Sequence, residues 1–273
     1  MLSPSSSLII AFLAVTCLAE TPKNTAPQFD RDTTIRIVEG IRRADYEGDR
    51  AALNRLHDQL VPPEDKVLAS RVLYWRGFAL WHRAINGFNE TPTPIDLQDD
   101  LNAAIADFKN SMNAQPDYVE PKIAAASCYG YVLFLNMKNQ ARFQELIQHS
   151  SPLLKAAMAS DPDNPRLLWV LGPIRWNTPP DQGGGQDKAF DVYNKGLESA
   201  RKQKTPSDPL EVSWGEPELL MNLAWSNLNR TKPDLVAAQQ NAEAALKIVP
   251  YWHYVRDILL PQIKAAQNER DLN

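Results

Sequence analysis

The chain has 273 residues, of which 44% are apolar and 23% are charged, and its formal net charge is −4. This composition is that of a folded protein with a buried core. A nucleic-acid-binding protein would need a concentrated basic face, whereas Lys and Arg form only two clusters here, Arg42-Arg43 and Arg201-Lys202-Gln203-Lys204. Both clusters fall where helix ends are expected. We therefore interpret them as solvated ends that complement a helix dipole, and we expect no nucleic acid as a partner.

The first residues predict export. Leu8 to Leu18 is an uninterrupted run of apolar or small residues, too short to span a bilayer but suited to the core of a secretory signal. We predict a signal peptide over residues 1–19, a flexible linker over 20–30, a periplasmic or secreted location and no transmembrane span in the mature chain. The alternative is a lipoprotein anchored through Cys17, whose preceding residues match the lipobox poorly.

A ladder of small and apolar residues recurs from residue 31 onward. A small residue is followed four positions later by a larger apolar one, three later by another small one and five later by Pro. Steps of four and three place these side chains on one helix face, and the Pro ends the helix. The ladders are Ala104, Phe108, Ser111 and Pro116; Ser150, Leu154, Ala157 and Pro162; Ala189, Tyr193 and Gly196; and Ala238, Ala242, Ala245 and Pro250.

Each ladder is preceded by a second helical run with its own small residue. These residues are Gly77, Ala126, Gly172 and Ala224, and Gly40 with Ala52 and Leu56 forms a fainter pair nearer the N-terminus. No alternating strand pattern of any length competes with them. The sequence therefore predicts an all-α protein of about five helix hairpins.

The hairpins resemble the tetratricopeptide repeat (TPR), whose pattern reads W-x2-L-G-x2-Y, then A-x3-F, then a later Pro. The nearest matches are "LWVLG" at 168–172 and "AIADF" at 104–108. The resemblance implies an α-α superhelix over residues 31–268. Tyr251 to Gln267, interrupted by Pro261, is expected to be a helix that caps the open end.

The spacing inside the hairpins departs from the family pattern, which steps about 12 residues between the two small residues. Gly77 and Ala104 are 27 positions apart. The longest excess, Asn86 to Gln98, contains Gly and Pro, so we expect a projecting insertion rather than a longer helix.

The stretch "PPDQGGGQDKA" from Pro179 to Ala189 raises the question of a phosphate-binding loop. Lys188 occupies the position where either glycine-rich phosphate motif requires a further Gly, and the loop follows a helix rather than a strand. We interpret it as a joint between two helices. The alternative is an anion site at the next helix N-terminus, formed by Gly184, Gly185 and Lys188.

Similar Gly-rich joints occur in exported TPR proteins. This loop, the predicted signal and the long inserts give a weaker resemblance to the T component that accompanies some TRAP-type transporters.

In such stacks, the first helix of each pair lines the concave surface, and an aromatic stripe falls there. Aromatic side chains in a groove would suit an extended peptide, an amphipathic helix or an apolar small molecule. The alternative is that the rings fill the core and leave no groove. The candidate binding residues are Tyr74, Trp81, His82, Tyr131, Trp169, Trp176, Asn177 and Trp225.

Catalytic signals are weak. The four histidines show no metal-binding spacing, and Cys128 stands alone in an apolar helical run. We expect no enzyme, metal or cofactor. The favoured function is an exported scaffold that binds a protein or peptide. The alternatives are a transporter accessory protein that carries a hydrophobic or acidic ligand, and a purely structural module.

Overall fold

The computed structural model describes residues 29–90 and 96–271, and this part of the chain contains helices and no strand. The predicted signal peptide, Cys17 and residues 20–28 of the predicted linker lie outside the described residues. The elements are α1 (Arg31–Glu47), α2 (Arg50–Gln59), α3 (Lys66–Glu90), α4 (Leu97–Ala114), α5 (Glu120–Leu135), α6 (Gln140–Ser160), α7 (Pro165–Asn177), η1 (Pro180–Gln182), α8 (Gln186–Lys202), α9 (Glu216–Asn229), α10 (Leu235–Ile248), η2 (Tyr254–Leu259) and α11 (Leu260–Asp271).

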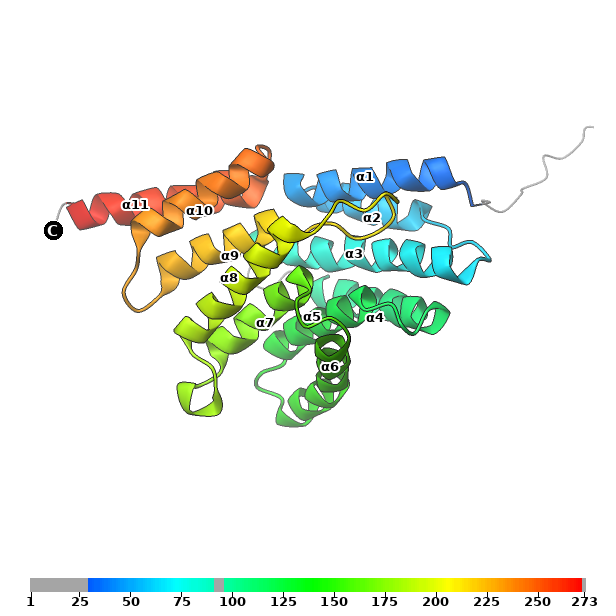
Figure 1. Ribbon diagram of the computed structural model, residues 1–273, viewed down its shortest axis with the longest axis horizontal. Helices are drawn as coiled ribbons and strands as arrows, with labels where there is room; N and C mark the ends of the chain where they lie inside the picture. The colour runs from blue at the N-terminus through cyan, green and yellow to red at the C-terminus, as the bar shows by residue number, and fades with distance from the viewer. Residues whose placement is uncertain (1–28, 91–95, 272–273) are drawn as a thin grey trace, which may run out of the picture.

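The helices form five successive hairpins, α1/α2 to α9/α10, and each second helix also contacts the first helix of the next hairpin. Successive first helices touch one another as well, which curves the array into a superhelix. In Figure 1 the array bends until α10 returns toward the end of α1, and α11 lies along α10 at the C-terminus. The predicted all-α superhelix of five hairpins with a capping helix is confirmed.

The predicted small residues of the first helices receive large side chains from the second helices. A Cβ placed on Gly77 would lie 2.7 Å from Cε1 of Phe108, and one on Gly172 would lie 1.9 Å from Cε1 of Tyr193. Each ring therefore occupies the space that a side chain would fill. This contact lets the two helices of a hairpin approach closely.

The expected insertion at Asn86 to Gln98 is wrong in its first part, because α3 continues without interruption to Glu90. A glycine inside a helix costs only about 1 kcal/mol, and the first proline of this stretch comes after the helix has ended. At Gly87 the absent side chain leaves room for Leu97, whose Cδ2 would lie 3.1 Å from a Cβ. The extra residues of this hairpin therefore lengthen its helices.

Proline lies at or near the start of three helices. Asn164 caps α7 through the amides of Arg166 and Leu167, and Pro165 is the first helical residue. Helix α9 begins with Glu216 and Pro217. Pro233, however, precedes its helix, because Asp234 is the N-cap of α10.

The interruption expected at Pro261 is a change of helix type. The wide-turn helix η2 ends at Leu259, and Pro261 lies in the first turn of α11. Proline has no amide hydrogen to donate, so a locally altered hydrogen-bond pattern before it is expected.

The contact of Gly172 with Tyr193 can be tested by adding one methyl group. We expect Gly172→Ala to lower the free energy of unfolding by about 1–3 kcal/mol, because the new Cβ overlaps the ring. Gly130→Ala, at an exposed position of the otherwise mostly buried helix α5, meets nothing within 4 Å and should raise stability by up to about 1 kcal/mol. Urea unfolding of both variants measures the difference. Equal midpoints would show that the contact does not set the helix spacing.

Candidate ligand-binding pocket

The predicted concave stripe is covered by the chain itself. Residues 203–215, here called the crossing segment, connect α8 to α9, and Leu210, Val212 and Trp214 from this segment are buried. The Trp75 indole donates a hydrogen bond to the Leu210 carbonyl at 2.8 Å, and the Trp214 indole donates to the Tyr74 hydroxyl at 3.0 Å. The segment therefore fills the position that a bound peptide would take in an open superhelix.

A buried arginine holds the crossing segment in place. Arg166 of α7 is 2% exposed and pairs with Glu120 of α5 at 2.6 Å. Its guanidinium also donates to the carbonyl of Trp214 at 3.1 Å and to the side chain of Gln203 at 2.7 Å. Removing one partner of a buried ion pair costs about 3–5 kcal/mol, so the segment is a fixed part of the fold.

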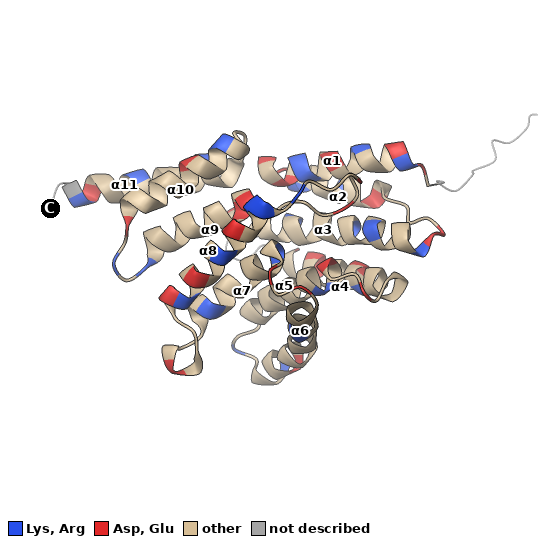
Figure 2. Ribbon diagram, in the orientation of Figure 1, with Lys and Arg blue, Asp and Glu red and all other residues tan. Residues whose placement is uncertain are grey.

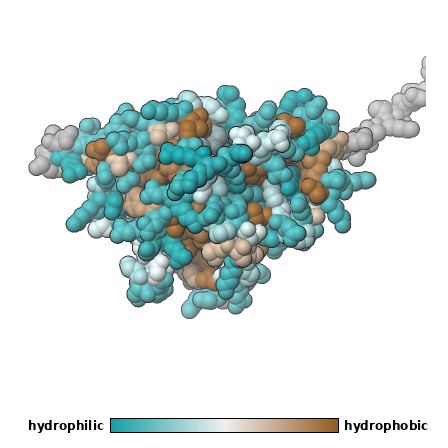
Figure 3. All heavy atoms as spheres, in the orientation of Figure 1, coloured by the Kyte–Doolittle hydropathy of each residue, from teal (hydrophilic) through white to brown (hydrophobic). Residues whose placement is uncertain are grey.

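Four of the predicted groove residues belong to the core. Tyr74, Trp81, His82 and Trp169 are each no more than 6% exposed, and the Trp214 ring lies within 5.9 Å of the rings of Trp81, His82 and Trp169. The prediction that they line an open groove is wrong, and the alternative that the rings fill the interior describes them. Figure 3 shows one face of the molecule with mostly hydrophilic side chains and separate apolar patches.

The other four candidates lie toward the opposite ends of the first helices. Tyr131 and Trp176 are half-buried, and Asn177 is exposed. Trp225 is 38% exposed, and its ring lies 5.4 Å from that of Trp176. They do not share a continuous groove with the four buried residues.

The glycine loop is a joint between two helices, as predicted from its mismatch with both glycine-rich phosphate-binding motifs. The amide of Gly183 donates to the Pro180 carbonyl, that of Gly184 to Pro179 and that of Gly185 to Arg175. A Cβ on Gly184 would lie 2.1 Å from the Thr178 carbonyl oxygen, so the tight chain reversal requires glycine there. All three amides are already used and cannot cradle an anion.

Lys188 does not complete the alternative anion site. Its ammonium group pairs with Asp191 at 3.2 Å on the exposed face of α8. The loop does line a pocket of about 620 Å³ with Trp176 and Arg230, but Arg230 lies beside Asp187 at 3.6 Å. The predicted donor set of Gly184, Gly185 and Lys188 is therefore wrong.

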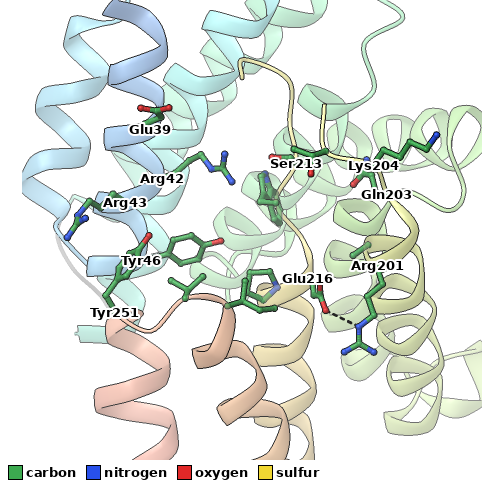
Figure 4. A pocket seen from close by; sticks show the side chains of 16 residues that line it. Glu39, Arg42, Arg43, Tyr46, Arg201, Gln203, Lys204, Ser213, Glu216 and Tyr251 are labelled. Carbon is green, nitrogen blue, oxygen red and sulfur yellow. Dashed lines mark hydrogen bonds and ion pairs between the residues drawn. The ribbon is translucent and has the colours of Figure 1, made fainter. Parts of the chain in front are cut away.

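A second pocket, of about 630 Å³, lies where the first hairpin meets the end of the array. Its walls come from α1, the end of α8 with the crossing segment, the start of α9 and the turn after α10, as Figure 4 shows. We call it the joint pocket. Its charged and aromatic lining residues are Glu39, Arg42, Arg43, Tyr46, Arg201, Lys204, Trp214, Glu216 and Tyr251.

The two basic clusters of the sequence converge in the joint pocket. Arg42 and Arg43 come from α1, and Arg201 and Lys204 come from the end of α8 and the crossing segment. Figure 2 shows basic residues on α1 and around the α8–α9 connection, and Figure 4 shows Arg42 pointing toward the crossing segment. The interpretation as a solvated helix end holds for the second cluster, because Arg201 and Lys202 are exposed in the last turn of α8. Arg42 and Arg43 lie before the last turn of α1, and residues of both clusters also line this pocket.

The pocket carries more positive charge than its acids neutralise. Four cations line it against the two acids Glu39 and Glu216, but Arg201 is paired with Glu216 at 2.9 Å and Arg43 is paired with Glu47 at 2.8 Å. Within residues 29–90 and 96–271, neither Arg42 nor Lys204 forms an ion pair. The chain as a whole has a net charge of −4, so this is a local reversal of sign.

Aromatic rings close the joint between the first and last units. The Tyr46 ring lies edge-on to Trp252 at 5.1 Å and to Tyr251 at 6.3 Å. The guanidinium of Arg43 lies over the Tyr251 ring at 5.2 Å from its centroid. The wall of the pocket is therefore the same contact that closes the curve of the superhelix.

A buried polar cluster lies behind this wall. The Tyr46 hydroxyl donates to the carboxylate of Glu218, and burial raises the pKa of both groups above their usual values. Nδ1 of His82 lies 2.9 Å from Oδ2 of Asp45, whose Oδ1 accepts a hydrogen bond from Asn86 at 3.1 Å. Three helices, α1, α3 and α9, thus meet through ionisable side chains.

The described residues contain no group of three or more metal-ligating side chains. Burial raises the pKa of the Cys128 thiol well above its usual value, so this cysteine is a poor nucleophile. Each of the four histidines lies beside a carboxylate: His57 beside Asp58 and Asp107, His82 beside Asp45, His149 beside Glu145, and His253 beside Asp257. Among the described helices, none has both the length and the apolar character needed to cross a bilayer.

No family model matches the chain, and no curated protein matches it. Two solved structures are similar. One is the HusA haemophore from Porphyromonas gingivalis, with a TM-score of 0.56 and 19% identity over 71% of this chain and 91% of that one. The other is a thermophilic TPR protein from Thermus thermophilus, with a TM-score of 0.51 and 16% identity over 86% of this chain and 99% of that one. These likenesses show a TPR-like fold, and the resemblance to the T component stays a prediction.

The burial of the aromatic stripe predicts different costs for two tryptophans. We expect Trp214→Ala to lower the free energy of unfolding by about 3–5 kcal/mol, because it empties a cavity among packed rings. Trp225→Ala should cost no more than about 1 kcal/mol, since its ring is partly exposed. Chemical denaturation of the two variants measures both values. A small loss for Trp214→Ala would mean that the crossing segment is not part of the core.

Proposed function

We propose that this TPR-like superhelix is an exported scaffold that binds an acidic segment of a protein partner in the joint pocket. The single observation that carries the proposal is the convergence of two basic clusters, separated by about 160 residues of sequence, on one aromatic-walled pocket.

The chemistry of the pocket supports an acidic and partly aromatic ligand. Among the residues that the structure describes, Arg42 and Lys204 form no ion pair, so an incoming carboxylate does not have to break one there. Tyr46, Trp214 and Tyr251 offer ring contacts, and Tyr, Trp and Arg are the residue types that dominate binding hot spots. A volume of about 630 Å³ accommodates a few side chains of a peptide.

Charge reversal in the pocket tests this proposal. We expect Arg42→Glu combined with Lys204→Glu to weaken the binding of a capped pentapeptide, four glutamates around one tyrosine, by at least about tenfold. Arg36→Glu combined with Lys232→Glu makes the same change of net charge outside the joint pocket and should have little effect. Fluorescence anisotropy with a labelled peptide gives both affinities.

The salt dependence provides an independent check. Binding by the unmodified protein should weaken as salt rises, because exposed charges are screened beyond a Debye length of about 10 Å at 0.1 M. Equal affinities of the pocket and control variants, or an affinity insensitive to salt, would contradict the proposed site.

Export is part of the same proposal and rests on the apolar run in residues 1–19. Expression in a bacterial host with an intact export system, followed by N-terminal sequencing, tests it. We expect the mature chain to begin after Ala19. A mature chain that still begins at Met1 would contradict cleavage.

A second candidate is a carrier of a small acidic ligand, such as the accessory protein of a transporter. The similar HusA protein is named a haemophore. Haem combines an apolar plane with carboxylates, and the joint pocket combines aromatic rings with cations. Titration with haemin should then produce a saturable absorbance change that the double charge reversal removes. If haemin gives no such change while the peptide binds, haem is excluded as the ligand of this pocket.

A further inference from the structure

We propose that the joint pocket takes up a proton together with its acidic ligand, and that Glu218 is the group that binds this proton. The inference rests on the proposed function and adds a form of regulation to the same site. Its basis is the position of a fully enclosed carboxyl group directly behind a pocket wall.

Glu218 is adjacent in sequence to the lining residues Glu216 and Pro217, and it is 4% exposed. One carboxylate oxygen accepts from the hydroxyl of the lining residue Tyr46, and the other accepts from the amide of Gly215 at 2.8 Å. A single side chain thus connects Glu218 to the pocket. A charge that enters the pocket beside Tyr46 therefore acts on a carboxyl group that is hydrogen-bonded to this lining residue.

The groups around Glu218 do not neutralise it fully. From α1 it faces Asp45 and Tyr46, with Arg42 also acting on Tyr46, and from α3 it faces His82. The His82 imidazole is therefore the nearby base for two carboxyl groups, Asp45 and Glu218, and its Nδ1 contacts Asp45 rather than Glu218.

More distant charges largely cancel. Within the cluster's surroundings, Arg166 of α7 and Glu120 of α5 form their own ion pair at 2.6 Å. Burial and the charge of Asp45 raise the pKa of Glu218, while the Tyr46 hydrogen bond and His82 lower it, and the net shift is upward. The upward shift means that this carboxyl takes up a proton at a higher pH than a free glutamate does.

The sign of the coupling follows from linkage. A negative ligand in the pocket favours the neutral form of Glu218, so the pKa of this carboxyl is higher in the complex than in the free protein. By reciprocity, a protonated Glu218 favours the ligand. Affinity must therefore rise as the pH falls through the pKa of Glu218 in the complex, and it levels off below the pKa in the free protein. One coupled proton permits a slope of up to about tenfold per pH unit.

The test needs a probe whose own charge does not change. A capped pentapeptide with sulfotyrosine at its centre and neutral flanking residues keeps its sulfate ester ionised between about pH 5 and pH 8, while free Glu side chains titrate near 4.3. We expect its affinity to increase as the pH is lowered across this range. Calorimetry in two buffers of different ionisation enthalpy should show proton uptake on binding.

Three variants separate Glu218 from the other titrating groups. Glu218→Gln keeps the shape and should remove both the pH dependence and the proton uptake. Glu216→Gln makes the same chemical change on the exposed side of the pocket, and it should tighten binding at every pH and keep the slope. Tyr46→Phe keeps the ring but removes the hydrogen bond that lowers the pKa of Glu218, so its affinity profile should move to higher pH.

The outcomes distinguish the two proposals. If neither the sulfotyrosine peptide nor the glutamate peptide binds at any pH, the proposed function fails. If a peptide binds and the profile of Glu218→Gln equals that of the unmodified protein, only the proton coupling is overturned. Should Glu218→Gln not fold, as judged by its thermal unfolding, an unshifted Tyr46→Phe profile overturns the coupling.

Discussion

The structure depends on one repeated contact, in which a large side chain of the second helix occupies the space of a missing side chain on the first. Phe108 fills this space at Gly77 and Tyr193 fills it at Gly172. The contact fixes how closely two helices approach, and therefore which residues of the first helix turn inward. Curvature, the filled interior and the position of the joint pocket all follow from that spacing.

Close helix approach leaves a narrow interior, and the crossing segment closes it. Trp214 packs against rings of α3 and α7, while Arg166 holds the backbone of the same segment. An open TPR-like array offers its concave surface to a partner, but here the chain supplies the occupant. The exposed binding chemistry is consequently found at the edge of the crossing segment, where the first and last units meet.

The sequence predicted the repeats well because the small and large residues that make the contact are spaced at helical intervals. It could not decide whether Trp81 and Trp169 line a groove or a core, since the periodicity is the same in both cases. Leu210, Val212 and Trp214 alternate over too few residues to indicate a segment that crosses the interior. The joint pocket could not be predicted from the sequence either, because the proximity of Arg42 and Lys204 depends on the accumulated curvature of five hairpins. Glu218 reads in sequence as an ordinary acid of a first helical turn.

The contact of Tyr46 with Trp252 joins the first unit of the array directly to the last one, so the array is closed rather than open-ended. In a linear solenoid each repeat contacts only its neighbours, so units can fray, duplicate or be lost with local consequences. Here the two end units stabilise each other directly. Insertion or deletion of one hairpin would move the two end units apart and break their contact. The number of repeats is therefore constrained by this contact as well as by the stacking of neighbouring hairpins.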